Sequence, residues 1–269
     1  MKSNLDRLFI ATFSSKAEET AKEYGFGLEL NDLCISRNLE ADKREWVIER
    51  MHGELERASS LDKKVIMHGP FTELTPDAID PGAIDLMIKR YMDTISICLE
   101  MGIRDLVLHD GYIPLLYQKS WHIKRSIDFW SDFAERVPED FTIYIENVFD
   151  DEPDTLCEII DRVNENLKRE KGRALYKICL DIGHANALTH GGTEEIIRWI
   201  KNMGMRIGHF HLHNNDGFQD LHNHVNEGTL DIETVLKEIM KFCHPDSTMT
   251  IESRDAEPSA KFLKEFFGG

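Results

Sequence analysis

The chain of 269 residues concentrates metal-binding side chains between residues 211 and 224. Four histidines and two aspartates fall within these fourteen residues, and the run 205–210 before them is typical of a short strand. Imidazole and carboxylate groups at the end of a strand are the ligands that a divalent metal needs. A histidine-rich loop can also be a solvated surface segment, so the rest of the chain must decide between the two interpretations.

The remaining sequence alternates short apolar runs with longer amphipathic segments. Eight runs are predicted to be strands, and they span residues 8–13, 26–30, 64–68, 105–109, 141–146, 175–181, 206–211 and 248–252. Eight segments have helical spacing, and they cover 16–24 after a cap at Ser14 or Ser15, 42–60, 80–101, 121–136, 153–170, 193–203, 231–242 and 259–267.

This alternation predicts an α/β fold, a (β/α)8 TIM barrel that occupies residues 1–269 as a single domain. The alternative is an open doubly wound sheet. No glycine-rich phosphate loop follows the first strand, which favours the barrel.

Six successive predicted strands end on a residue type that binds metals. Alone, each of these residues would be read as a satisfied polar group or a helix cap. In a parallel barrel, however, the carboxyl ends of all strands lie on one face, and active sites lie there. The convergence of six such side chains therefore predicts a metal centre made by His68, His109, Glu146, Asp181, His211 and Glu252.

Three further candidates lie close to these strand ends. His184 follows Asp181 by three residues, on the loop that leaves the sixth strand. Asp220 and His222 are two residues apart, so their side chains point to the same side if the segment is extended. A single Zn²⁺ needs three or four protein ligands, and nine candidates suffice for two or three ions.

Composition limits the partners and the compartment. The net charge of −17, from 32 basic and 49 acidic residues, disfavours charge-driven binding to nucleic acid or to an anionic membrane. No apolar run is long enough to cross a membrane, and the N-terminus lacks the apolar core of a signal peptide. Five widely spaced cysteines without a CxxC pair predict reduced thiols in a cytoplasmic protein.

The candidate ligands lie in segments that resemble the xylose isomerase-like barrel superfamily, which joins endonuclease IV to many sugar isomerases and epimerases. The resemblance covers the third to the eighth strand. It is most specific in the spacing from Asp220 through His222 to Glu227, which is similar to the endonuclease IV pattern. The segments that carry it are Ile145-Glu146-Asn147, Cys179-Leu180-Asp181-Ile182-Gly183-His184-Ala185, the His211 strand end, Asp220-Leu221-His222, Asn226-Glu227-Gly228 and Glu252.

The resemblance implies two alternative ligand schemes. In the endonuclease IV scheme, His68 and His109 hold one ion and Glu146 bridges to a second. Asp181, His211 and Glu252 complete the second ion, and His184, Asp220 and His222 hold a third. In the epimerase scheme, one Mn²⁺-like ion is held by Glu146, Asp181, His211 and Glu252.

The epimerase scheme also implies catalytic roles. Glu146 and Glu252 move protons on either side of the sugar carbon, and His184 binds a substrate oxygen.

The sequence departs from the endonuclease pattern at three places. The loop after His68 lacks a Tyr-Leu pair that would enter DNA, and His109 is followed by Asp110 where the family has proline. The segment 31–40 offers one arginine, Arg37, although a DNA-bending surface needs several phosphate contacts.

We therefore expect a metal-dependent isomerase or epimerase of a small sugar or sugar phosphate, with Zn²⁺ or Mn²⁺ at one to three ions per chain. The alternative is a zinc phosphodiesterase with two or three ions that acts on abasic DNA or on a smaller phosphoester. A barrel that holds metal without turnover is a third class. The expected partner is a carbohydrate and not a membrane; the oligomeric state stays open, and a homo-oligomer is among the states allowed.

Five neighbouring residues are weaker candidates for a direct role. Asn147 is placed to orient a carboxylate or a substrate, and Arg254 is placed to face a substrate oxyanion. The other three are His190, His213 and His224, which the sequence favours as neighbours of the ligands or as exposed side chains.

Overall fold

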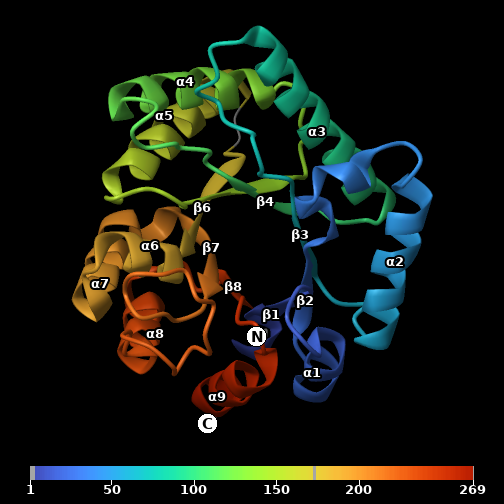
Figure 1. Cartoon of the computed structure of the whole chain (residues 1–269), viewed down its shortest axis with the longest axis vertical. Helices are drawn as coiled ribbons and strands as arrows, with labels where there is room; N and C mark the ends of the chain where they lie inside the picture. The colour runs from blue at the N-terminus through green and yellow to red at the C-terminus, as the bar shows by residue number, and fades with distance from the viewer. Residues whose placement is uncertain (1–3, 172–173, 269) are drawn as a thin grey trace.

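The computed structural model of the chain describes residues 4–171 and 174–268. Eight parallel strands follow one another around a closed barrel, and β1 pairs with β8 to complete it (Figure 1). The predicted TIM barrel is confirmed. The strands are β1 Leu8–Ala11, β2 Gly27–Leu30, β3 Val65–His68, β4 Asp105–His109, β5 Thr142–Glu146, β6 Tyr176–Asp181, β7 Ile207–Leu212 and β8 Thr248–Ile251.

The helices form a ring around the strands (Figure 1). The α-helices are α1 Ala17–Tyr24, α2 Arg44–Arg57, α3 Pro81–Glu100, α4 Lys119–Phe133, α5 Asp154–Lys171, α6 Ile182–Thr189, α7 Gly192–Met203, α8 Ile232–Phe242 and α9 Ala256–Gly268. Short 3-10 turns are η1 Asn4–Arg7, η2 Asp32–Cys34, η3 Ser36–Leu39 and η4 Gly204–Arg206.

Two local predictions were wrong. Residues 182–189 form helix α6, where the sequence analysis placed a loop. The predicted serine cap of α1 is absent: Lys16 precedes the helix with φ 57° and makes no side-chain cap. The hydroxyl of Ser14 instead donates to the carbonyl of Ser253 at 2.5 Å, which ties the β1 loop to the segment after β8.

The barrel has two apolar cores, because alternate side chains of each strand point inward and outward. The larger core lies between the strands and the helices. A smaller cluster inside the barrel consists of Phe9, Ile66, Val107, Tyr144 and Cys179, and it fills the space below the polar strand ends. The interior is therefore a packed support for the residues above it and not a channel.

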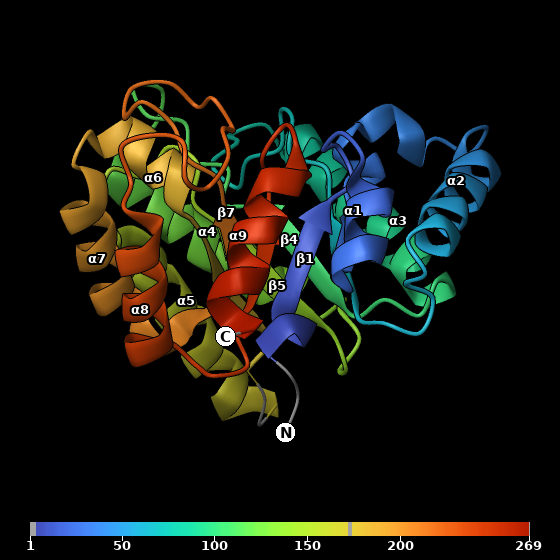
Figure 2. The same ribbon diagram turned by 90° about the horizontal axis from the view of Figure 1, so that it is seen from below.

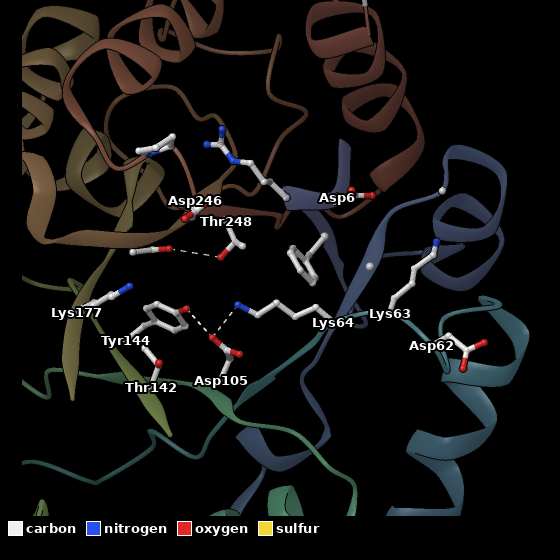
Figure 3. A pocket seen from close by; sticks show the side chains of 16 residues that line it. Asp6, Asp62, Lys63, Lys64, Asp105, Thr142, Tyr144, Lys177, Asp246 and Thr248 are labelled. Atoms are coloured by element: carbon white, nitrogen blue, oxygen red, sulfur yellow. Dashed lines mark hydrogen bonds and ion pairs between the residues drawn. The ribbon is translucent and has the colours of Figure 1, made fainter. Parts of the chain in front are cut away.

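A cavity of about 950 Å³ lies at the amino end of the strands (Figure 3). Its wall includes Lys64 and Tyr144, and both contact one oxygen of Asp105, at 2.9 Å and 2.6 Å. Phe9 also lines it. This end of a TIM barrel supports stability, and the catalytic loops lie at the opposite end.

The opposite end carries the loops that follow the strands. In Figure 2, β1 points upward and the long segment between β7 and α8 lies at the upper left. This segment contains the histidine-rich residues that first indicated metal chemistry. Within residues 4–171 and 174–268, no helix is long and apolar enough to span a membrane.

The inner cluster predicts a large cost for Phe9→Ala. Phe9 is 1 % exposed and packs inside the barrel, so its removal leaves a cavity that the closed strands cannot collapse to fill. We expect the free energy of unfolding to fall by about 3–5 kcal/mol in urea denaturation. The surface control Leu61→Ala should change it by about 0.5 kcal/mol or less. A loss below about 1 kcal/mol for Phe9→Ala would show that the cluster does not support the barrel.

Candidate metal centre at the carboxyl end of the barrel

The strand register places the predicted ligands at the same height along the barrel axis, at the carboxyl ends of the strands. His109 of β4 is paired with Glu146 of β5, and Asp181 of β6 is paired with His211 of β7. A one-residue register shift between β6 and β7 precedes the second pair. All nine predicted residues lie at the carboxyl ends of strands or in the segments that follow them, and short contacts link them into one network.

Glu146 is the centre of this network. One of its oxygens, Oε2, lies 3.2 Å from His68 Nε2 and 3.4 Å from His109 Nε2. The other, Oε1, lies 3.2 Å from His211 Nδ1 and 3.3 Å from His184 Nδ1. Burial alone would raise the pKa of this carboxyl, but the charges of His211 and His109 hold it well below its ordinary value. An ionised carboxylate shared in this way is suited to bridge two ions.

Each of three histidines uses one ring nitrogen to contact a protein acceptor. The other nitrogen faces the centre of the carboxyl end of the barrel, which we call the barrel mouth. His68 Nδ1 lies 3.0 Å from the carbonyl of Gly69, and His222 Nδ1 lies 2.6 Å from that of Glu252. His184 Nδ1 lies 3.1 Å from the carbonyl of Asn147, which leaves Nε2 facing Asp220. Such outer partners fix the orientation and tautomer of a metal-binding imidazole.

His211 is oriented by a carboxylate that the sequence analysis missed. Glu29 of β2 is fully buried, and its Oε1 lies 3.1 Å from His211 Nε2. Its Oε2 accepts from Thr250 at 2.5 Å and lies 3.0 Å from His209 Nε2. Burial would raise the pKa of Glu29, yet the two imidazoles hold it well below its ordinary value. The available signal was an acidic residue in the middle of the apolar strand 26–30.

His184 lies on the first turn of α6 rather than on the predicted loop. The carboxylate of Asp181 caps this helix, because its Oδ1 accepts from the amide of His184 at 2.7 Å. Oδ2 of Asp181 stays within 3.5 Å of His184 Nδ1. Although burial would raise the pKa of Asp181, His184 and His213 lower it to about 2.

Asp220 and His222 meet, but not by the predicted extended geometry. His222 has φ 50°, in the left-handed region, so the argument from strand alternation was wrong. Their side chains nevertheless approach to 3.1 Å, between His222 Nε2 and Asp220 Oδ2. Asp220 Oδ2 also lies 3.4 Å from His184 Nε2, so these three residues form one cluster.

His213 belongs to the same cluster, although from the sequence it was only a weak candidate. It is fully buried, its Nε2 lies 3.1 Å from Asp181 Oδ1, and its ring stacks on His222 with centroids 4.0 Å apart. Gly183 makes room for it, because a Cβ at that position would lie 1.9 Å from His213 Cε1. The signal for this contact in the sequence was Gly183 in the segment Asp181-Ile182-Gly183-His184, because a glycine leaves room for a neighbouring ring.

The other weak candidates lie outside the ligand clusters. His190 ends α6 and contacts the carbonyl of Gly217, while His224 contacts that of Asp255. The side chain of Asn147 brackets Asp181, since it accepts from the amide and donates to the carbonyl of that residue. Arg254 is exposed, and its backbone amide donates to the backbone carbonyl of His222.

The donor set fits divalent metal ions. His211 Nδ1 is buried without a hydrogen-bond partner among the described residues, yet it lies 3.2 Å from Glu146 Oε1 and 3.5 Å from Glu252 Oε2. Ligand atoms around a tetrahedral ion with bonds of about 2.1 Å are about 3.4 Å apart. The clusters that could hold an ion include His68/His109/Glu146, Glu146/Asp181/His184, Glu29/His68/His211/Glu252 and His184/His213/Asp220/His222.

Comparison with known families assigns the chain. The family model described as "Xylose isomerase-like TIM barrel" matches residues 68–266. The chain belongs to this family. The predicted resemblance is thereby confirmed, and the match begins at His68, the first of the predicted ligands.

Individual proteins and solved structures are also similar to the chain over most of its length. MJ1311 of Methanocaldococcus jannaschii is 30 % identical over 226 residues, which cover 79 % of this chain and 73 % of that protein. The crystal structure of a D-tagatose 3-epimerase-like protein superposes with a TM-score of 0.71 at 23 % identity, over 97 % of both chains. The TTHB071 protein from Thermus thermophilus, soaked with ZnCl2, superposes with a TM-score of 0.72 at 22 % identity, over 97 % of this chain and 98 % of that one. These two structures share the fold.

The contact between Glu29 and His211 predicts a change in metal affinity for Glu29→Gln. The amide keeps the size of the side chain but removes the charge that orients His211. We expect Zn²⁺ or Mn²⁺ to bind about 10–100-fold more weakly in competition titrations with a chromophoric chelator. Glu265→Gln, an exposed change on α9, is the matched control and should bind as the parent does. Equal affinities in both variants would contradict a role for Glu29 in holding the ligand.

Proposed function

We propose that this protein is a metal-dependent isomerase or epimerase of a small sugar or sugar phosphate. One observation carries the proposal: Glu146 at the end of β5 and Glu252 directly after β8 approach the same nitrogen, His211 Nδ1. Two buried carboxylates thus flank one metal-ligand position. This arrangement suits the removal of a proton from one face of a substrate carbon and its return from another side.

The two carboxyl groups differ in their affinity for protons. Burial raises the pKa of Glu252, and the nearby charges of Glu146 and Glu29 raise it further against the effect of His211. The pKa of Glu146 is held low by its imidazole neighbours. When the surroundings of two carboxyl groups give them different pKa values, one group can act as the acid and the other as the base. Glu252 is therefore the better proton acceptor of the two, and Glu146 is the more readily ionised.

The remaining residues bind the metal ion and orient the substrate. Asp181 and His211 complete the set that holds the ion, and a bound divalent ion would supply polarisation of a carbonyl oxygen. His184 lies between Glu146 and Asp220 and is placed to donate to a substrate oxygen.

Two partly exposed aromatic rings support a small substrate. Phe71 stacks on His109 at 4.2 Å, and Phe13 meets His222 edge-on at 5.6 Å. Aromatic faces next to polar ligands suit the mixed apolar and hydroxyl surface of a sugar. The net charge of −17 weighs against a long polyanionic substrate.

The isosteric change Glu252→Gln tests the proton-transfer role. We expect it to lower isomerisation by about 10²–10⁴-fold on the substrate found in a panel of ketoses and sugar phosphates. Deuterium uptake from D2O into the substrate, followed by NMR, should fall in parallel. Glu265→Gln serves as the control with unchanged turnover. Retained deuterium uptake in Glu252→Gln would remove this residue from the reaction.

A second function is favoured by one specific observation. The cluster of His184, His213, Asp220 and His222 provides ligands that a single-ion isomerase does not need. Together with the ligands around Glu146, it could support two or three ions that activate water against a phosphoester. A zinc phosphoesterase is therefore the alternative proposal.

The variant Asp220→Asn separates the two functions. It removes a carboxylate that lies within 3.4 Å of both His184 and His222. For an isomerase with one ion, we expect turnover to stay within about 10-fold of the parent, a loss smaller than that for a proton-transfer group. For a hydrolase, cleavage of bis-p-nitrophenyl phosphate or of an abasic duplex should be lost, together with one ion per chain in elemental analysis. Parent protein that holds one ion and cleaves neither phosphoester would exclude the hydrolase.

A further inference from the structure

A second polar cluster is buried outside the barrel mouth, between the ends of β4 and β5 and the helix α4. It consists of His122 of α4 and three aspartates that follow successive strands: Asp77 after β3, Asp110 after β4 and Asp150 after β5. All four side chains are at most 2 % exposed. Asp110 directly follows His109, but its side chain faces His122 whereas that of His109 faces Glu146.

We propose that Asp110, His122 and Asp150 bind a divalent metal ion, and that Asp77 orients His122 for this role. The site is separate from the ligands of the barrel mouth, and it does not depend on the reaction proposed there.

The orientation of His122 is that of a metal ligand. Its Nδ1 lies 3.0 Å from Asp77 Oδ2, so in a metal-bound site this nitrogen would donate and Nε2 would offer its lone pair to the ion. Nε2 lies 3.3 Å from Asp110 Oδ2, and both atoms are buried. A carboxylate behind one ring nitrogen and a free second nitrogen is the usual arrangement at metal-binding histidines. The distance of 3.3 Å is close to the separation of about 3.4 Å between neighbouring ligands of one tetrahedral ion.

Asp150 provides an independent sign of a cation at this position. Both of its oxygens are buried, and no ion pair with a Lys, Arg or His side chain reaches them in the part of the chain that the structure describes. Its carboxyl lies beside that of Asp110 and is under the electrostatic influence of His122. The nearby Lys119 does not compensate these charges, because its ammonium group pairs with Asp151 and Glu152. Unpaired buried carboxylates are costly, and a bound cation would remove that cost.

In the metal-free protein, protons take the place of the cation. Burial and then the charge of Asp110 raise the pKa of Asp150 well above its ordinary value. Burial would lower the pKa of His122, but Asp110 and Asp77 raise it to about 10. The competing interpretation is therefore a network that holds two protons and never binds metal, and the experiment must distinguish these two occupants.

The ligand types define the class of ion and its role. One imidazole and two carboxylates suit Zn²⁺ or Mn²⁺. The ligands come from three successive segments that are closed off from solvent, so the ion would join the β4 and β5 loops to α4. We assign it a structural role that supports the strand ends below the barrel mouth.

Metal counting tests the proposal on the full chain. The parent protein and two isosteric variants, Asp150→Asn and Asp110→Asn, are stripped with a chelator, reconstituted with Zn²⁺ or Mn²⁺, and desalted. We expect each variant to hold one ion per chain fewer than the parent by elemental analysis. Asp151→Asn, an exposed neighbour that pairs with Lys119, is the matched control and should keep the parental count. Equal counts in all four proteins would overturn the proposal.

A measurement on the parent protein covers the case in which the variants do not fold. Crystals of the zinc-reconstituted chain should show an anomalous peak at the zinc edge, bounded by Asp110, His122 and Asp150. Anomalous peaks at the barrel mouth without one at this position would overturn the proposal in favour of the proton network.

Discussion

The barrel mouth depends on one buried carboxylate that contacts four imidazoles. Glu146 is 1 % exposed, and a charge in such a position is tolerated only when partners replace its water. His68 and His109 reach one oxygen, and His184 and His211 reach the other. These partners come from four segments, so the strands that carry them must keep their register to within a fraction of a residue.

Much of this arrangement could be predicted because a closed parallel barrel imposes it. Once eight parallel strands alternate with helices in a closed barrel, the carboxyl ends of all strands lie on one face. Residue type at the strand ends then indicates which side chains meet. This is why His109 and Glu146, which are 37 positions apart, could be placed together before their pairing in the sheet was known. The same reasoning explains the agreement for Asp181 and His211.

The residues that escaped prediction depend on distances across the barrel or on local backbone shape. Glu29 lies within a strand, and its partner His211 is 182 positions away in sequence, on a strand that β2 does not pair with. His213 fits because Gly183 has no side chain, a steric fact that strand periodicity does not encode. His222 and Asp220 were predicted as neighbours, but not the left-handed backbone conformation of His222, which alternation arguments do not consider. For Glu29 and His213 the deciding factor is tertiary packing, and for His222 it is the local backbone conformation.

The end of β4 illustrates how one strand serves two polar clusters. Alternation sends His109 into the mouth and Asp110 toward α4. The neighbouring strands repeat this division, since the segments that begin after His68 and Glu146 also carry Asp77 and Asp150. The strands β3, β4 and β5, which supply His68, His109 and Glu146 to the mouth, are thus followed by the segments that surround His122. A displacement of α4 would move these loops. The charges of the cluster around His122 therefore affect the positions of the ligands at the barrel mouth.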